Sequence, residues 1–295
     1  PTYHHRVVST DTSGNTTPSP SATFTTTPTP VGPSSLVSDD FSSGVLGSGW
    51  SVVDPLGDGS VSLVGQGTSD ARLSLGVAGG VSHNAWTPNE SLRVVQSVAD
   101  EDFEVVTKFD SVPVSTYDQQ GIVVQADSQN WLRLSVHRDS SGLRAFVSKV
   151  VGGNASTVSN SALSVSGSSM WLRVTRSGDS WTYATSGDGV TFSTRASFSV
   201  AMAVSEVGVL AGNYARGSAS PYTALVDYVF NTASPISPED PTGPPVPDTT
   251  PPVVSGVLVS PADTSAVVSW NTDEAASSRV EFGLTAVLES PAVTD

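Results

Sequence analysis

The sequence contains no cysteine among its 295 residues, which excludes disulfides and thiolate zinc sites. Charge is also scarce, because only 14% of the residues are Asp, Glu, Lys or Arg. The 28 acidic residues outnumber the 13 Lys and Arg, so the formal net charge is -15, and no basic patch offsets it. Such a surface repels phosphate backbones, and we expect no nucleic-acid partner.

Long apolar runs are missing as well. No stretch approaches the roughly 18 apolar residues of a membrane-spanning helix, so we expect no membrane span. The chain starts at Pro1 without a leader, and we expect a processed or excised piece of a larger multidomain protein. Gly, Pro, Ser and Thr are abundant instead, as in many surface proteins of bacteria and archaea. We therefore expect a secreted or cell-surface location.

Apolar and polar residues alternate with period two through most of the chain, and no window shows sustained helical periodicity. This pattern predicts an all-β fold, with an antiparallel double sheet of about 12 to 14 strands over residues 38–231. The clearest strands are Phe103–Phe109, Gly121–Ala126, Trp131–Val136, Leu143–Val150, Trp171–Arg176, Trp181–Ser186, Val207–Ala211 and Leu225–Phe230. Short linkers such as Ser177-Gly178-Asp179 favour hairpins between neighbours.

Two linkers bound this central domain. Residues 232–251 are Pro-rich, which is typical of an extended spacer. Residues 31–37 form the second linker and follow a predicted hairpin in 1–30. A further set of strands is expected in 252–295.

The two flanks resemble parts of a fibronectin type III domain, an immunoglobulin-like sandwich. Tyr3-His4-His5-Arg6-Val7 and Asp11-Thr12-Ser13-Gly14-Asn15 are similar to its closing strands. Asp248-Thr249-Thr250-Pro251-Pro252 and Trp270-Asn271-Thr272-Asp273 are similar to its opening strands. Neither half can bury its apolar residues alone. The halves therefore either complete each other, within one chain or head-to-tail between copies as in a filament, or continue into a tandem array.

The central domain resembles the concanavalin A-like lectin/glucanase domains, in particular laminin-G-like modules and accessory domains of glycoside hydrolases. Ser38-Asp39-Asp40-Phe41-Ser42 followed by Gly49-Trp50 is similar to the entry strand of these domains. Asn130-Trp131-Leu132-Arg133-Leu134 and Leu225-Val226-Asp227-Tyr228 continue the similarity. The resemblance implies a jelly-roll sandwich and leaves its ligand open.

Catalysis is not expected. Hydrolases of this fold carry a Glu-x-Asp-x-x-Glu strand motif, whose carboxylates act as nucleophile and acid/base. The nearest run, Glu101-Asp102-Phe103-Glu104, has the wrong spacing, since Glu101 and Asp102 would point to opposite faces. No Gly-x-Ser-x-Gly elbow is present either.

The strand 131–137 carries the candidate binding residues. Leu132, Leu134 and Val136 form an apolar face, so Trp131, Arg133 and His137 share the other. Together with Gln125, and with Arg173 on a later strand, these side chains are suited to stack on a sugar ring and to bond its hydroxyls.

Trp181 and Tyr183 repeat the same pattern further along the chain. The hypothesis is a glycan-binding or adhesive module for a polysaccharide or surface glycan, and the alternative is a structural repeat of a stalk or filament. For the aromatic residues themselves, the alternative to sugar binding is that loops cover them, or that cross-strand pairing uses them for stability.

Calcium is the cofactor that the laminin-G-like resemblance implies. First and last strands pair in that family, which would bring Asp39 or Asp40 near Asp227. The alternative is that these are solvated turn carboxylates, and no Asp-x-Asp-x-Asp-Gly loop is present.

Overall fold

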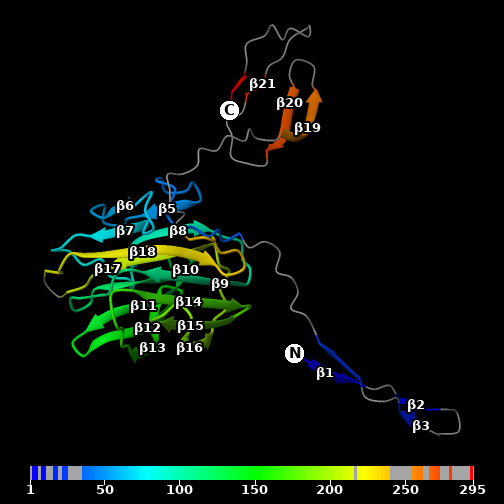
Figure 1. Cartoon of the computed structure of the whole chain (residues 1–295), viewed down its shortest axis with the longest axis horizontal. Helices are drawn as coiled ribbons and strands as arrows, with labels where there is room; N and C mark the ends of the chain where they lie inside the picture. The colour runs from blue at the N-terminus through cyan, green and yellow to red at the C-terminus, as the bar shows by residue number, and fades with distance from the viewer. Residues whose placement is uncertain are drawn as a thin grey trace. The chain divides into compact units, whose positions relative to one another are not determined.

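The computed structural model describes residues 35–215 and 218–239 throughout and only short strands outside them (Figure 1). The described residues in the flanks are 2–5, 8–10, 16–18, 22–25, 254–261, 266–272, 279–280 and 293–294. The chain divides into two units, residues 1–245 and 246–295.

The central domain consists of two seven-stranded antiparallel sheets. In spatial order, the front sheet contains β13 (Asn154–Ala162), β12 (Gly142–Val151), β11 (Asn130–Asp139), β10 (Gln119–Asp127), β17 (Glu206–Gly212), β8 (Leu92–Ser97) and β5 (Trp50–Val53). The back sheet contains β16 (Ser193–Ser199), β15 (Ser180–Ser186), β14 (Met170–Ser177), β9 (Phe103–Phe109), β18 (Tyr222–Asn231), β7 (Arg72–Val77) and β6 (Ser60–Val64). The expected all-β class and the central sandwich are confirmed. None of the described residues belongs to a helix that could span a membrane.

The main core lies between the two sheets, because alternation turns every second side chain inward. Leu132, Leu134 and Val136 of β11 share one apolar cluster with Leu172 and Val174 of β14, and each is at most 1% exposed. Burying a side chain of this size contributes about 1.5–3 kcal/mol to folding. The predicted core face of the strand 131–137 is therefore confirmed.

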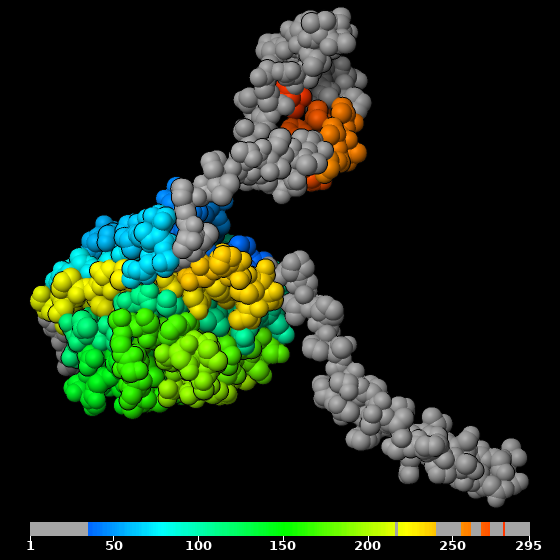
Figure 2. All heavy atoms as spheres, in the orientation of Figure 1, coloured from blue at the N-terminus to red at the C-terminus, as the bar shows by residue number. Residues whose placement is uncertain are grey.

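The beginning and the end of the domain lie side by side. Asp39 and Val229 exchange two backbone hydrogen bonds of 2.9 Å each. The side chain of Asn231 donates to the Leu36 carbonyl at 3.0 Å. Figure 2 shows the blue residues that open the domain against the gold residues that close it. The first and last segments of the domain therefore pair, as the resemblance implied.

The flanks contain short antiparallel pairs. In the first unit, β1 (Thr2–His5) pairs with β4 (Ala22–Thr25), and β2 (Val8–Thr10) pairs with β3 (Thr16–Pro18). In the second unit, β19 (Val254–Pro261) pairs with β20 (Ala266–Thr272), and β21 (Arg279–Val280) pairs with β22 (Val293–Thr294).

The expected completion of one flank by the other would place Tyr3 and Val7 on Trp270 or Val280. That contact falls outside the described part of the chain, because neither Val7 nor the side chain of Tyr3 is described.

Candidate functional site

The connection between β7 and β8, residues 78–91, crosses the outer face of the front sheet. The backbone N–H of Ala85 donates to the side-chain oxygen of Gln119 at 3.3 Å. The carbonyl of Ala85 accepts a hydrogen bond from Arg133 at 3.2 Å. Further along, the hydroxyl of Thr87 donates to the Gly153 carbonyl at 3.2 Å. These bonds hold the connection on β10, on β11 and on the turn after β12.

This connection covers Trp131. The side chain is 1% exposed and belongs to a second apolar cluster on the outer face. Its other buried members are Ala85, Val95, Val123, Val150 and Leu210. The alternation of β11 holds, since Trp131 and Leu132 point to opposite sides, but both sides are buried. The prediction that Trp131 stacks on a sugar is therefore wrong.

Beyond this cover, the outer face of the front sheet contains a groove of about 320 Å³. It is lined by Asn84, Tyr117, Gln119, Arg133, His137, Asp139, Phe146, Asn160 and Tyr214. We call this set the outer groove. Small-molecule sites range from about 300 to 1,000 Å³, so its volume suffices for a small ligand.

Arg133 lies at the bottom of the outer groove and is 5% exposed. Its Nε donates to the Ser135 hydroxyl at 2.7 Å, and its Nη2 lies 3.5 Å from Nδ1 of His137. The guanidinium carbon lies 4.7 Å from the centroid of the Phe146 ring. Burial lowers the pKa of Arg133 to about 9, so the group remains a cation at neutral pH.

Aromatic rings form one side of the outer groove. The His137 ring lies edge-on to Phe146 at 5.0 Å, and Tyr117 lies edge-on to Tyr214 at 5.6 Å between centroids. Burial, and then the charge of Arg133, lower the pKa of His137 to about 4, so its imidazole is neutral at pH 7.

Tyr117 presents the most accessible ring of this aromatic side. Its side chain is 44% exposed, and its backbone φ is 68°. This left-handed conformation costs a residue with a side chain about 1–2 kcal/mol, and such strain gathers at ligand-binding positions. The groove therefore combines an exposed ring, a cation and side-chain amides, a set that can stack on a ligand and hydrogen-bond to it.

Two other predicted ligand residues lie elsewhere. Gln125 pairs with Trp131 across β10 and β11 and bonds to Glu206, so it does not line the outer groove. Arg173 belongs to β14 of the back sheet, where its guanidinium lies 4.3 Å from the Phe192 ring. The predicted single platform is therefore wrong, and only Arg133 and His137 come together.

Trp181 and Tyr183 correct the interpretation of β15. Both are at most 1% exposed and belong to the main core between the sheets. The period of two holds along β15, but its aromatic face turns toward the core, because alternation alone does not fix which face of a strand is buried.

Sequence reasoning missed the other residues that line the outer groove: Asn84, Tyr117, Gln119, Asp139, Phe146, Asn160 and Tyr214. Two of them could have been found from hairpin register, since β11 and β12 pair Ser135 with Phe146, and β12 and β13 pair Phe146 with Asn160. Tyr117 and Tyr214 lie outside the strands, and no local pattern marks them.

The predicted calcium ligands do not assemble as expected. The carboxylate of Asp39 accepts hydrogen bonds from the Phe41 backbone and the Trp50 ring, each at 2.7 Å. The carboxylate of Asp40 accepts two bonds from Ser42. Asp39, Asp40 and Asp227 form no cluster of converging carboxylates in the described part of the chain. Their own turns occupy Asp39 and Asp40 instead.

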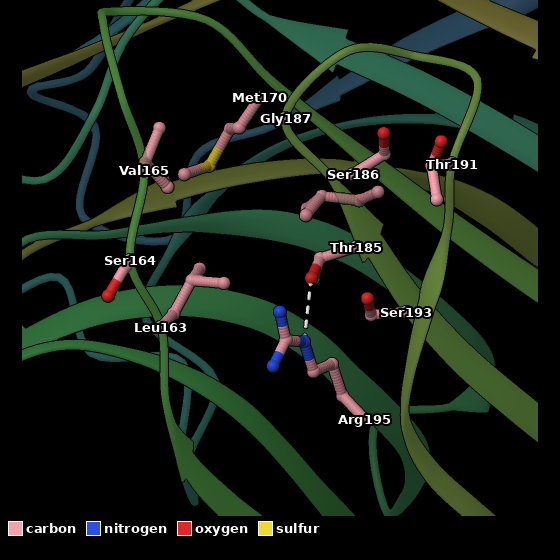
Figure 3. A pocket seen from close by; sticks show the side chains of 11 residues that line it. Leu163, Ser164, Val165, Met170, Thr185, Ser186, Gly187, Thr191, Ser193 and Arg195 are labelled. Atoms are coloured by element: carbon pink, nitrogen blue, oxygen red, sulfur yellow. Dashed lines mark hydrogen bonds between the residues drawn. The ribbon is translucent and has the colours of Figure 1, made fainter.

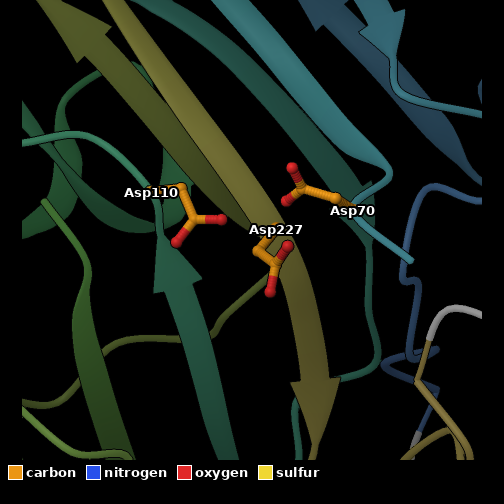
Figure 4. A group of neighbouring side chains, drawn as sticks. All are labelled: Asp70, Asp110 and Asp227. Atoms are coloured by element: carbon orange, nitrogen blue, oxygen red, sulfur yellow. The ribbon is translucent and has the colours of Figure 1, made fainter. Parts of the chain in front are cut away.

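Asp227 lies with two different carboxylates. Its oxygens and those of Asp70 and Asp110 lie within 4.8 Å of one another. Figure 4 shows the three groups approaching from β18, from the end of β9 and from the segment before β7. Two cations of the chain are already there: the Lys108 ammonium lies 2.6 Å from Asp227, and the Arg72 guanidinium lies 3.8 Å from Asp110.

Lys108 is held as a cation by this cluster. Its burial alone would lower its pKa, but the hydrogen bond from Lys108 to Asp227 and the charges of Asp227 and Asp110 raise it. The cluster is therefore arranged as an ion network within the domain.

A second cavity, of about 80 Å³, lies near Leu163, Met170 and Arg195 (Figure 3). The Arg195 guanidinium donates to the Thr185 hydroxyl at 2.8 Å across it. This volume is well below the range of ligand sites, so the outer groove is the stronger candidate.

Residues 82–230 match a family model described as protein of unknown function (DUF1349), and this range includes every residue that lines the outer groove. No curated protein matches the sequence. A functionally unknown protein from Saccharomyces cerevisiae has a similar structure, with a TM-score of 0.50 and 16% identity. The similarity covers 62% of this chain and 97% of the yeast chain.

Two glycoside hydrolase structures are also similar. The GH43B protein of a Bacteroides ovatus xyloglucan PUL has a TM-score of 0.52 and 18% identity, and xylan beta-1,4-xylosidase from Bacillus halodurans C-125 has 0.50 and 17%. Each similarity covers 75% of this chain but 45% of the hydrolase. The chain thus spans less than half the length of these hydrolases, and identities this low show the fold alone.

Proposed function

The chain belongs to the DUF1349 family of proteins of unknown function, and we propose that it is a non-catalytic saccharide-binding module of a secreted or cell-surface protein. The outer groove is the proposed binding site. The observation that carries the proposal is Tyr117, a half-exposed ring in a left-handed backbone conformation at the edge of a groove lined with polar groups.

The chemistry of the lining suits a sugar. A sugar ring offers a C–H face that packs on an aromatic ring and hydroxyls that both donate and accept. Asn84 and Asn160 accept hydrogen bonds from Gln119 and Arg144 through their side-chain oxygens. Their NH₂ groups have no partner among the described residues and are available to ligand hydroxyls.

The carboxylates support a binding role over catalysis. Glycoside hydrolysis normally needs two carboxyl groups on either side of the scissile bond. Asp139 is the one carboxylate among the residues described as lining the groove, and it lies 3.5 Å from Arg144. Asp102 and Glu104 accept hydrogen bonds from Gly178 and Thr175 in a different part of the domain.

The names of two glycoside hydrolases of similar fold refer to the polysaccharides xyloglucan and xylan. A binding module of this fold would hold a larger protein on a polysaccharide or surface glycan.

A glycan array probed with the full chain tests this function. We expect binding to at least one saccharide class, and at least a tenfold loss of affinity in Tyr117→Ala with an unchanged melting temperature. Arg173→Ala, on the opposite sheet, is the matched control and should bind as the native chain does. An array without any bound glycan, or an equal loss in the control, would contradict the proposal.

The second unit favours a further candidate role, the association of copies in a stalk or filament. Val257, Leu258, Val259 and Val267 of β19 and β20 are 57% to 70% exposed. Exposed apolar strands favour pairing with another sheet, and a head-to-tail contact between copies would extend into a filament. Light scattering should then show mass rising with concentration for the native chain and not for Val259→Asp. A constant mass would exclude this role.

A further inference from the structure

Arg133 is the single Lys or Arg among the described residues that line the outer groove. No carboxylate among the described residues lies within ion-pair distance of it. Arg93, which is buried to a similar degree, likewise has no ion pair among them, whereas Arg176 lies 2.6 Å from Asp100 and Lys108 lies 2.6 Å from Asp227. The groove thus contains a buried cation without a counter-ion.

The guanidinium also has unused hydrogen-bonding capacity. It carries five N–H donors. One is used by Ser135, one by the Ala85 carbonyl, and one points to His137 at the long distance of 3.5 Å. Each terminal nitrogen therefore keeps one N–H without a partner among the described residues. Two N–H groups on one guanidinium match the two oxygens of a carboxylate.

The position of Arg133 in the outer groove makes its free N–H groups available to a ligand. The guanidinium lies against the Phe146 ring at 4.7 Å, on the floor of a groove whose rim is Tyr117. Burying a charge without an opposite charge is costly, and a ligand that supplied the missing charge would recover part of that cost.

We propose that the saccharide bound in the outer groove carries a carboxylate, as in a uronic acid, and that Arg133 pairs with it. This inference rests on the proposed saccharide-binding function and adds the class of sugar. The ring of the sugar packs on Tyr117, and its carboxylate reaches the free N–H groups of Arg133.

The acidic surface does not oppose this pairing at short range. The net charge of -15 is spread over the chain, and physiological salt screens charges beyond about 8 Å. Asp139, the acidic residue that lines the groove, lies 3.5 Å from the Arg144 guanidinium, which offsets its charge. His137 is neutral at pH 7, so Arg133 supplies the positive charge among the described residues that line the groove.

The test compares uronic acid trimers with their methyl esters, which keep the sugar and remove the charge. Trimers of galacturonate, glucuronate and mannuronate are titrated into the full chain by calorimetry at pH 7, each beside its ester. A sulfated galactan oligosaccharide is the comparison for a different anion. We expect at least one acid to bind at least tenfold more tightly than its ester and than the sulfated oligosaccharide.

Variants test whether Arg133 is the residue that causes the preference for the acid over its ester. Arg133→Gln should remove the preference for the acid over its ester, and Arg133→Lys should retain only part of it, because a lysine cannot form two parallel bonds to a carboxylate. Arg173→Gln should keep the full preference. The affinities of the native chain for the acid and for its ester already test the proposal, so the test does not depend on whether an Arg133 variant folds.

The outcomes distinguish this inference from the saccharide-binding function on which it rests. Esters or neutral glycans that bind as tightly as the acids, with Tyr117→Ala abolishing binding, would overturn the carboxylate and leave the saccharide site. Equal binding of the sulfated oligosaccharide would overturn the carboxylate as the specific group. No binding of any trimer, ester or arrayed glycan would overturn both proposals.

Discussion

The guanidinium of Arg133 lies 4.7 Å from the ring centroid of Phe146 on the neighbouring strand, although register pairs Phe146 with Ser135 and not with Arg133. The arginine side chain therefore leans along β11, over the small Ser135, and its Nε bonds to the Ser135 hydroxyl at 2.7 Å. Gly121 pairs with Ser135 from the other side. Two small residues thus give Arg133 the room to lie flat on the sheet.

Gly121→Ala should destabilise the domain. A Cβ at this position would come within 2.5 Å of the Ser135 Cα and Cβ and 2.6 Å of the Leu134 carbonyl oxygen, so the strands would have to separate. We expect a loss of about 1–3 kcal/mol in free energy of unfolding, measured by chemical denaturation. Gly49→Ala is the control, because its Cβ would meet nothing within 4 Å. Equal effects of the two variants would contradict this account of the sheet.

Trp131→Ala should cost stability because the ring fills the apolar cluster beneath residues 78–91. Truncating a buried tryptophan removes about 3–5 kcal/mol of unfolding free energy. Trp131→Phe should cost clearly less, because it keeps most of the apolar volume and the ring N–H has no hydrogen-bond partner among the described residues. Thermal denaturation distinguishes the two. An unchanged melting temperature in the alanine variant would show that the ring is not part of a packed cluster.

His137 should make the domain less stable in mild acid. The pKa of His137 is about 4 in the folded chain, against about 6.5 when unfolded, because burial and Arg133 disfavour its charged form. The unfolded chain therefore binds a proton first as pH falls. Neutral His137 contributes on the order of 3 kcal/mol to the free energy of unfolding. This contribution is complete above pH 6.5 and is lost between pH 6.5 and 4.

The difference between native chain and His137→Gln isolates this effect from the titration of the carboxylates. Unfolding free energies measured from pH 7 to pH 4 should fall more steeply for the native chain. Parallel curves for the two proteins would mean that His137 is not held neutral by its surroundings.

Calcium should act on the acidic cluster only when its resident cation is removed. Lys108 lies 2.6 Å from Asp227 and 3.6 Å from Asp110, so the native cluster is already compensated. We expect millimolar Ca²⁺ to leave the melting temperature of the native chain unchanged and to raise that of Lys108→Met. Lys149→Met serves as the control. A rise in the native chain would restore calcium as a cofactor of this domain.

The alternation of apolar and polar residues is a local pattern of the sequence. It correctly placed Leu132, Leu134 and Val136 in the core between two antiparallel sheets. Hairpin linkers such as Ser177-Gly178-Asp179 likewise predicted the neighbours of individual strands. Both features depend on residues close in the chain, because side chains alternate along a strand and short turns join strands that pair directly.

Tertiary structure alone decided which outer surfaces stay open and which carboxylates meet. Residues 78–91 cover Trp131, and Asp227 meets Asp70 and Asp110 because β18 pairs with both β7 and β9. The outer groove gathers residues from 84 to 214, whose separation in the chain leaves no local pattern. The two-residue period of side chains along a strand defines two faces for each strand. Which residues lie over a face depends on register and on the path of connections that are distant in the chain.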